Sequence, residues 1–287
     1  MEFLEIEPED SQYKIVYVDL VHRCNMECAN CYLPNREFPD MDADEIISLI
    51  SRFTKRTEFR FIGGEPTLHR ELPRIIQAVN SMPLNHRIAL VTNGLKLASK
   101  RYTQRLKEAG LKTVYLSMTG FDDDEVYKIT DELACAKQKM MALHNCVEAK
   151  IRLAIGCIVI KGLNEHIIGR MKSHIDELGI RVAFEFRNVG QVGRYMRGNT
   201  ASENYTFDEL IALVHDTFGI DRDNLKILAS DEYGLYVKHD RYRVGVTNWS
   251  SVAVGFPKEA NYTRGRITQN MKVAPFLEHV RVNENGY

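Results

Sequence analysis

The chain carries a cysteine motif of the kind that holds a metal centre. Its 287 residues include six cysteines, and three of them, Cys24, Cys28 and Cys31, lie within eight positions in the stretch RCNMECANCYLP. Asparagines between the cysteines and a proline after them discourage a helix, so we expect a loop. Thiolates are ligands of zinc and of iron–sulfur clusters. The spacing therefore predicts a metal site in a loop.

The residues alone allow three interpretations of this loop. Spacings of four and three also place side chains on one face of a buried helix, where free cysteine is common. A structural zinc site needs four protein ligands, but no second CxxC pair is present in the sequence. A four-iron cluster held by three thiolates leaves one iron free to bind a small molecule. We favour this third interpretation, in which the missing fourth cysteine is a functional feature.

The composition indicates a globular protein without a strong charge bias. Hydrophobic residues make up 44% of the chain, and the formal net charge is -1 at pH 7. This balance gives no general case for nucleic-acid binding or for attraction to a membrane surface. No apolar run is long enough to span a membrane, and the acidic start MEFLEIEPEDSQYK lacks the features of a secretory signal. We therefore expect a cytoplasmic protein whose thiols stay reduced.

Short β-branched runs alternate with amphipathic segments over the first two thirds of the chain. This pattern is typical of β/α units around a parallel sheet and predicts an α/β fold. The six predicted strands span residues 14–21, 58–63, 87–93, 113–119, 151–160 and 181–189. Parallel β/α barrels gather their ligand-binding groups at the carboxyl ends of the strands. The cysteines follow the first strand and polar or glycine-containing segments follow the others, so we expect one site at that edge.

The pattern changes after residue 190. The segment TFDELIALVHDTF opens with Thr206 and Glu209 at capping-box spacing and predicts a helix. The segment GLYVKHDRYRVGVTNW predicts two strands joined at residues 238–241. We predict a lead-in over residues 1–13, a β/α region over 14–190, and a C-terminal α+β extension over 191–287 that completes the substrate pocket.

A second motif, GGEP at residues 63–66, follows the second predicted strand. The pair of CxxxCxxC and GGEP resembles the radical S-adenosylmethionine (radical SAM) superfamily, and it is much more specific than either motif alone. The resemblance covers about residues 14–190 and implies a partial (β/α)6 barrel. It implies that Cys24, Cys28 and Cys31 hold one 4Fe-4S cluster whose open iron binds SAM. Reductive cleavage of SAM would then give a 5′-deoxyadenosyl radical that abstracts hydrogen from the substrate.

The same resemblance implies a set of SAM-binding residues. They are Gly63, Gly64, Glu65 and Pro66, with Asn93 after the third strand, Ser117 after the fourth, and Arg152 and Asn164 on and after the fifth. The glycines would allow close backbone approach to the ammonium group of SAM, and Glu65 would be an acceptor or a structural anchor. Plainer interpretations remain: GGEP as an ordinary turn, Ser117 as a strand-end hydroxyl, and Arg152 as a solvent-facing side chain.

The sequence departs from the family pattern in two places. Asn30 precedes the third cysteine where the family often has an aromatic residue, and Tyr32 follows it. The resulting CNxxCxxCY pattern is similar to a branch that includes maturases with cysteine-rich SPASM or twitch domains. No cysteine follows Cys157, so we expect no auxiliary cluster. Cys135, Cys146 and Cys157 are predicted to pack in the core.

Polar residues at the exit of the sixth strand are candidates for the substrate pocket. Alternation places Glu185 and Arg187 on one face of the strand, where they either bind substrate or pair with each other. The full candidate set is Glu185, Arg187, Asn188, Gln191 and Arg194.

The type of substrate is predicted only broadly. Thirteen residues precede the first predicted strand. This lead-in is too short for a separate N-terminal peptide-binding domain. We therefore expect a small-molecule substrate, such as a sugar, nucleoside or other metabolite, more than a peptide. An electron donor such as flavodoxin or ferredoxin is the implied partner. The alternatives are a peptide-modifying maturase, a glycyl-radical activase and, outside enzymes, a zinc-stabilised binding module.

Overall fold

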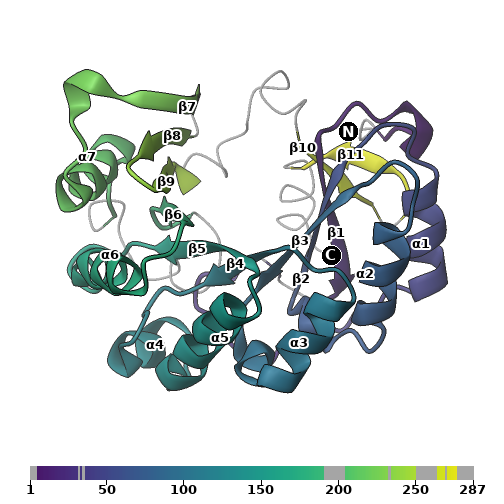
Figure 1. The fold of residues 1–287 in the computed structure, drawn as a ribbon, viewed down its shortest axis with the longest axis horizontal. Helices are drawn as coiled ribbons and strands as arrows, with labels where there is room; N and C mark the ends of the chain where they lie inside the picture. Colours follow the sequence, from purple (N-terminus) through teal and green to yellow (C-terminus); the bar gives the residue numbers. More distant parts are fainter. Residues whose placement is uncertain are drawn as a thin grey trace.

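The computed structural model describes residues 5–31, 33, 36–190, 204–231, 234–249, 264–268 and 270–276. Eleven strands form a single sheet with the order β11-β10-β1-β2-β3-β4-β5-β6-β9-β8-β7. Figure 1 shows this sheet as an open arc, with helices α1 to α7 along its outer face. The α/β class and the open, partial barrel predicted from the sequence are confirmed.

Six parallel strands form the centre of the sheet, in the order in which they occur in the chain. They are β1 (Ile15–Val21), β2 (Glu58–Gly63), β3 (Arg87–Thr92), β4 (Thr113–Ser117), β5 (Arg152–Ile158) and β6 (Val182–Arg187). Each predicted strand is confirmed, although several are shorter than predicted by one or two residues at an end. Their carboxyl ends therefore meet at one edge, as the site prediction requires.

Helices between these strands bury their apolar faces against the sheet. They are α1 (Ala43–Ser51), α2 (Leu72–Asn80), α3 (Lys100–Glu108), α4 (Asp124–Thr130), α5 (Ala136–Glu148) and α6 (His166–Leu178). Local capping sets where several begin: the carboxylates of Asp42 and Asp123 accept hydrogen bonds from the first backbone amides of α1 and α4. One hydrophobic core runs between the helices and the strands.

Alternation along the strands separates the core from the concave face of the sheet. On β6, Phe184 and Phe186 are fully buried against the helices, whereas Glu185 and Arg187 are only partly buried. On β1, Val16, Val18 and Leu20 belong to the core, whereas the alternate Tyr17 and Asp19 lie outside it although they are also buried. Polar side chains on the alternate positions therefore face the hollow of the arc.

The C-terminal region extends the sheet at both edges. Helix α7 (Phe207–Phe218) begins with the predicted capping box, and β8 (Gly234–His239) and β9 (Tyr242–Thr247) form the predicted hairpin. Strand β9 pairs in parallel with β6, and β7 (Lys226–Asp231) pairs with β8. At the other edge, β10 (Arg264–Ile267) pairs in parallel with β1, and β11 (Val273–Pro275) pairs with β10. The sequence did not predict β7, β10 or β11.

None of the helices in the described ranges is long and apolar enough to cross a membrane.

Asp176 at the end of α6 links this helix to the hairpin. Its carboxylate accepts hydrogen bonds from Lys172 (2.8 Å), Tyr242 and Arg241. These bonds, that of Lys172 first, hold the pKa of Asp176 below its ordinary value of 3.8. A carboxyl group whose pKa is lower in the folded state stabilises the fold above its unfolded pKa, and this contribution is lost as the pH falls.

We expect Asp176→Asn to lower the free energy of unfolding at pH 7. The difference from wild type should shrink as the pH falls below about 3.8, because the wild-type carboxylate is then lost as well. Urea unfolding at several pH values measures this. Asp216→Asn, which breaks the exposed pair with Arg222 (2.7 Å), is the control and should change little. A difference that does not depend on pH would contradict the prediction.

Candidate active site

The three cysteines lie in an irregular loop directly after β1. All three are free and half-buried, and no helix runs through residues 22–31. The loop is fixed from two sides: the Cys31 amide donates to the Cys28 carbonyl (3.1 Å), and the Ala29 amide donates to the carbonyl of Thr130, which lies at the end of α4 (2.7 Å). The predicted loop is confirmed, and the buried-helix interpretation is wrong.

The GGEP segment packs directly against the chain that enters the cysteine loop. The Gly64 amide donates to the Val21 carbonyl (2.7 Å), and the Glu65 amide donates to the Arg23 carbonyl (3.0 Å). Gly63 has a φ of +126°, which strongly favours glycine. A Cβ atom on Gly64 would lie 2.3 Å from the carbonyl oxygen of His22. Glycine is therefore required here by the close approach of two backbones.

Glu65 anchors the carboxyl ends of β2 and β3. Its side chain is fully buried. One oxygen accepts hydrogen bonds from the amide and hydroxyl of Thr67 and from the hydroxyl of Thr92 (2.6 Å), and the other accepts from the Asn93 amide (2.8 Å). Of the two roles considered for Glu65, the structure supports the structural anchor.

Asn93 lies beside the cysteine loop. Its side-chain amide donates to Asn25 Oδ1 (2.8 Å) and lies 3.8 Å from Cys24 Sγ, while its Oδ1 accepts from the Leu95 amide (3.0 Å). Together with Glu65, this places the ends of β1, β2 and β3 around one point. The structure thus brings together the cysteines, GGEP and Asn93 as predicted.

Burial favours the protonated form of the Cys24 and Cys28 thiols when no metal is bound. It is the largest cause that raises the pKa of Cys24 and of Cys28, with Asp131 the second cause at Cys28. Arg36 donates to the Met26 carbonyl within the loop. Burial lowers the pKa of Arg36, but Cys31 and Cys24 outweigh it and the pKa is raised. Metal binding would release the thiol protons, and Arg36 would offset part of the thiolate charge.

The loop has the chemistry that a 4Fe-4S cluster needs. It offers three free thiols, and Cys24 and Cys28 pack against a small apolar cluster of Met26, Tyr127, Cys135 and Ala136. Buried oxygens next to it, Asn30 Oδ1 and Thr130 Oγ1, have no hydrogen-bond partner within the described residues. Three cysteine thiolates on a shielded loop fit such a cluster.

Ser117 and Asn164 differ in what they can offer to SAM. Ser117 is exposed at the carboxyl end of β4, so its hydroxyl is accessible. Asn164 is fully buried, its amide group donates to the carbonyls of Thr119 and Ile158 (2.9 Å each), and its Oδ1 accepts from the Ile160 amide (2.7 Å). The side chain of Asn164 therefore ties the loops after β4 and β5 together and has no group left for direct binding.

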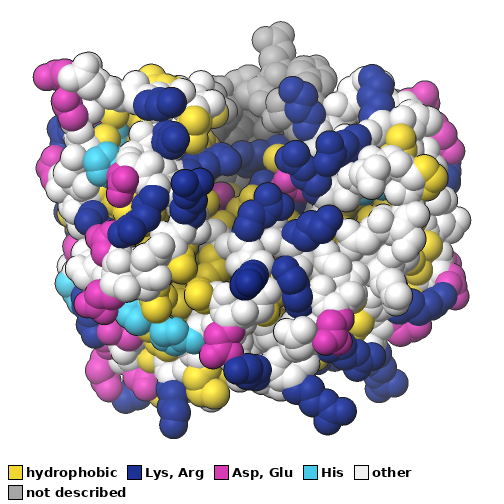
Figure 2. All heavy atoms as spheres, in the orientation of Figure 1, with side chains coloured by type: hydrophobic (Ala, Val, Ile, Leu, Met, Phe, Trp, Pro, Cys, Tyr) yellow, Lys and Arg dark blue, Asp and Glu magenta, His cyan; other side chains and the backbone are white. Residues whose placement is uncertain are grey.

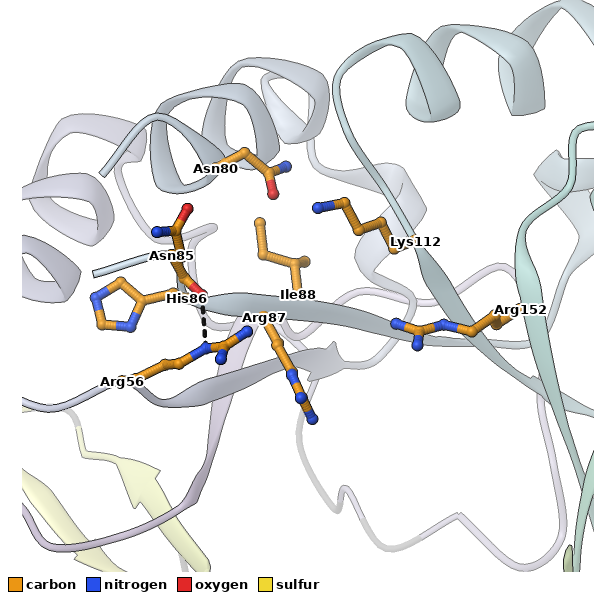
Figure 3. A pocket seen from close by; sticks show the side chains of 8 residues that line it. All are labelled: Arg56, Asn80, Asn85, His86, Arg87, Ile88, Lys112 and Arg152. Atoms are coloured by element: carbon orange, nitrogen blue, oxygen red, sulfur yellow. Dashed lines mark hydrogen bonds between the residues drawn. The ribbon is translucent and has the colours of Figure 1, made fainter. Parts of the chain in front are cut away.

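Arg152 lies at the wrong end of the barrel for SAM binding. It is the first residue of β5, whereas the cysteine loop follows the carboxyl ends of the strands, and its guanidinium donates to Thr113 Oγ1 (3.1 Å). Figure 3 shows it at a pocket of about 430 Å³ with Arg56, Asn80, Asn85, His86, Arg87, Ile88 and Lys112. The prediction for Arg152 is wrong because this residue begins β5, so the length of the strand separates its side chain from the cysteine loop.

The substrate candidates on β6 are partly committed to other contacts. Glu185 and Arg187 form an ion pair (3.0 Å), and the Arg187 guanidinium lies 5.6 Å from the centre of the Trp249 ring. Asn188 is fully buried, donates to the Tyr205 carbonyl (3.0 Å) and accepts from the Trp249 amide (2.6 Å). We therefore assign Asn188 to the support of the pocket wall. Gln191 and Arg194 lie outside the described residues.

The other three cysteines are buried, as predicted for core packing. Cys146 and Cys157 belong to the main hydrophobic core. Cys135 instead packs in the apolar cluster beside Cys24 and Cys28.

Comparison with known proteins identifies the family. Residues 18–174 match the Radical SAM superfamily. The chain belongs to the radical SAM superfamily. As a member, it is an enzyme that uses SAM and a 4Fe-4S cluster, and Cys24, Cys28 and Cys31 are the residues that fit the cluster.

Curated relatives are similar at 25–27% identity. GTP 3′,8-cyclase of Staphylococcus carnosus is 26% identical over 79% of this chain and 67% of its own length. GTP 3′,8-cyclase of Aquifex aeolicus is 27% identical over 71% of this chain and 65% of its own length. A 7,8-dihydro-6-hydroxymethylpterin dimethyltransferase of Methanocaldococcus jannaschii is 25% identical over 69% of this chain and 41% of its own. The chain thus spans about two thirds of the length of these cyclases.

Solved structures show the same fold. Streptococcus suis SuiB bound to precursor peptide SuiA has a TM-score of 0.70 at 17% identity, over 96% of this chain and 62% of SuiB. The anSMEcpe structure with bound AdoMet and Kp18Cys peptide has a TM-score of 0.56 at 18% identity, over 71% of this chain and 59% of its own.

Sequence reasoning missed two cations near the cysteine loop. Arg36 follows the third cysteine by five residues, and Lys139 lies in α5. The signal for Lys139 was present: a lysine stands at helical spacing between the apolar Ala136 and Leu143.

Proposed function

We propose that this radical SAM enzyme acts on an anionic small molecule bound in the hollow of the sheet. The cluster at Cys24, Cys28 and Cys31 would supply one electron that cleaves SAM into methionine and a 5′-deoxyadenosyl radical, which abstracts hydrogen from the substrate. The observation that carries the substrate class is the excess of cations on the concave face.

The residues around the cysteine loop have distinct roles in this proposal. The GGEP backbone, fixed by Glu65, would receive the amino group of SAM, because the glycines leave its carbonyl groups open to a ligand. Asn93 would hold the loop beside Cys24, and the exposed Ser117 hydroxyl would contact the ribose or methionyl part. Asn164 would keep the neighbouring loops in register and exclude water.

The concave face between β10 and β8 is strongly positive. Alternation and register place three carboxylates on it, Asp19, Glu58 and Glu185. The same rule places eight cations there: Arg60, Arg187, Lys238, Arg243, Arg264 and Arg266, together with Arg87 and Arg152, which lie at the amino ends of β3 and β5. Figure 2 shows Lys and Arg side chains gathered around this hollow. A hollow with one sign of charge raises the local concentration of ligands of the opposite sign.

Aromatic rings lie among these cations. The Arg60 guanidinium is 4.4 Å from the centre of the Tyr115 ring and 5.6 Å from that of Tyr17. Arg243 is 4.8 Å from the ring centre of Tyr236. Planar rings and guanidinium groups suit a ligand with both a flat ring system and an acidic group, such as a nucleotide or a pterin.

The curated relatives support the same class of substrate. GTP 3′,8-cyclase and the pterin dimethyltransferase are named for small molecules with fused rings. Residues 191–287 would complete the substrate pocket, since β9 carries Arg243 next to β6 and β10 carries Arg264 and Arg266 next to β1. We further propose a cytoplasmic location and a low-potential electron donor such as flavodoxin or ferredoxin.

The test is the release of 5′-deoxyadenosine by anaerobically reconstituted protein with SAM and dithionite. Nucleoside triphosphates and phosphorylated pterins should stimulate release and be converted to new products, detected by mass spectrometry. Uncharged nucleosides should stimulate much less. Stimulation by peptides alone would favour a peptide-modifying enzyme, for which the fold shared with SuiB is the precedent, and activation of a glycyl-radical partner would be a third outcome.

The variant Arg187→Met tests whether Arg187 recognises the anionic group of the substrate. We expect Arg187→Met to keep the iron content and the release of 5′-deoxyadenosine without substrate. Its kcat/KM for product formation should fall at least about tenfold, because the substrate is no longer held in the orientation that the reaction needs. Arg74→Met, which breaks an exposed ion pair with Glu71 (2.8 Å) on the outer helix α2, is the matched control. Loss of soluble protein would instead indicate that the pairing with Glu185 is structural.

A further inference from the structure

Lys139 is an ammonium group in the interior of the protein. The residue lies one turn into α5 and is 1% exposed. Its Nζ donates to the Ser117 carbonyl (2.8 Å) and lies 4.8 Å from the centre of the Tyr127 ring. An ammonium group has three donors, and within the described residues no carboxylate lies within 4.0 Å of it.

The surroundings of Lys139 are those of the cysteine loop. Tyr127, whose ring it contacts, packs with Met26 and Cys135 in the apolar cluster against which Cys24 and Cys28 lie. Lys139 is also close enough to Cys28 for its positive charge to act on the sulfur of that residue. The ammonium group of Lys139 therefore lies between the cysteine loop and the interior of the protein.

The burial of an ammonium group with so few partners is unfavourable for the folded protein unless a nearby negative charge compensates it. Moving an ammonium group out of water is unfavourable unless an anion or several hydrogen bonds compensate it. Three deprotonated cysteines and the sulfides of a 4Fe-4S cluster would supply that negative charge. Asp131, next to Cys28, supplies one negative charge on the same side, and a bound cluster would add more negative charge than this single carboxylate.

We propose that Lys139 is a positioning residue that offsets the negative charge of the cluster and thereby makes the cluster easier to reduce. Reduction adds one electron from an external low-potential donor, breaks no bond and raises the negative charge of the cluster by one unit. A fixed positive charge in a medium of low dielectric constant stabilises the reduced form more than the oxidised form. Through the Ser117 carbonyl, the same side chain ties α5 to the end of β4.

The test is a redox titration of the reconstituted protein without SAM, followed by the EPR signal of the reduced cluster. Iron content is measured first. We expect Lys139→Met to lower the reduction equilibrium constant at least tenfold, a shift of about 59 mV to more negative potential for one electron. Lys137→Met, the same change on the exposed face of α5, should leave the potential unchanged. An unchanged potential in a fully loaded Lys139→Met protein would overturn the proposal.

A second variant and a second measurement separate charge from structure. Lys139→Gln keeps a donor for the Ser117 carbonyl but removes the charge, so its potential should fall as in Lys139→Met. The metal-free Lys139→Met protein should be as stable to urea as wild type or more so, because a buried charge has been removed. If both variants fold but load no iron while Lys137→Met loads normally, the cluster requires the charge, which supports the proposal. If the metal-free variants unfold, Lys139 is structural and the proposal fails.

Discussion

Replacing Cys24, Cys28 and Cys31 together with alanine is expected to remove the iron and all SAM cleavage. Wild-type protein reconstituted without oxygen should carry about four irons per chain, the content of a single four-iron cluster. The triple variant should carry almost none and should release no 5′-deoxyadenosine with dithionite. The reason is that these three thiols lie together in the loop after β1, whereas Cys146 and Cys157 are enclosed in the hydrophobic core.

Cys146→Ala is the matched control for this experiment. Its thiol is fully buried in α5, and burial alone raises the pKa of Cys146 to about 12. The variant should keep its iron and its SAM cleavage. A triple variant that still carries about four irons per chain would show a second cluster site. It would also support a relationship to the maturases that hold auxiliary clusters. Wild type with full iron that releases no 5′-deoxyadenosine but still binds SAM by calorimetry would indicate cleavage gated by substrate.

Gly64→Ala is expected to lower the free energy of unfolding by about 3 kcal/mol or more, at the upper end of overpacking effects. The added Cβ would lie 2.3 Å from the His22 carbonyl oxygen and 2.4 Å from that of Arg23. Both are backbone atoms, so no side chain can rotate away. The strands β1 and β2 would have to separate at the point where the chain enters the cysteine loop, and iron loading should fall with stability.

Gly169→Ala is the control with the same chemical change. Gly169 lies in α6, and its added Cβ would be 3.8 Å from Thr217 Cγ2, an ordinary contact. Alanine in a helix is favoured over glycine by up to about 1 kcal/mol, so this variant should be as stable as wild type or slightly more stable. Urea unfolding of the metal-free proteins measures both. Equal stability of Gly64→Ala and wild type would show that the two backbones can separate at little cost.

The sequence by itself determined the parallel core of the sheet and the position of the cluster ligands. Both are encoded locally. Alternating β-branched runs produce a strand wherever they occur, and CxxxCxxC with its asparagines and proline produces a loop. Because all parallel strands end at one edge, the order of elements was enough to place the cysteines and GGEP together.

Tertiary structure decided which polar side chains remain available. Asn164 and Asn188 looked like ligands in the sequence, but Asn164 is held by backbone groups. Asn188 is held by the Tyr205 carbonyl, the Asn248 side chain and the amide of Trp249, which is 61 residues away in the chain. Arg152 stands at the start of its strand and Lys139 is buried behind the cysteine loop, which periodicity alone does not reveal. Hydrogen-bond satisfaction and burial depend on partners distant in sequence, so local patterns cannot specify them.

The edges of the sheet were decided in the same way. The hairpin of β8 and β9 was predictable because its pairing is local, but the parallel pairing of β9 with β6 and of β10 with β1 was not. Strand β10 is four residues long and is separated from β1 by more than 200 residues of chain. Its neighbour is chosen by which edge of the finished sheet offers free backbone groups, and that edge exists only once the central strands have assembled.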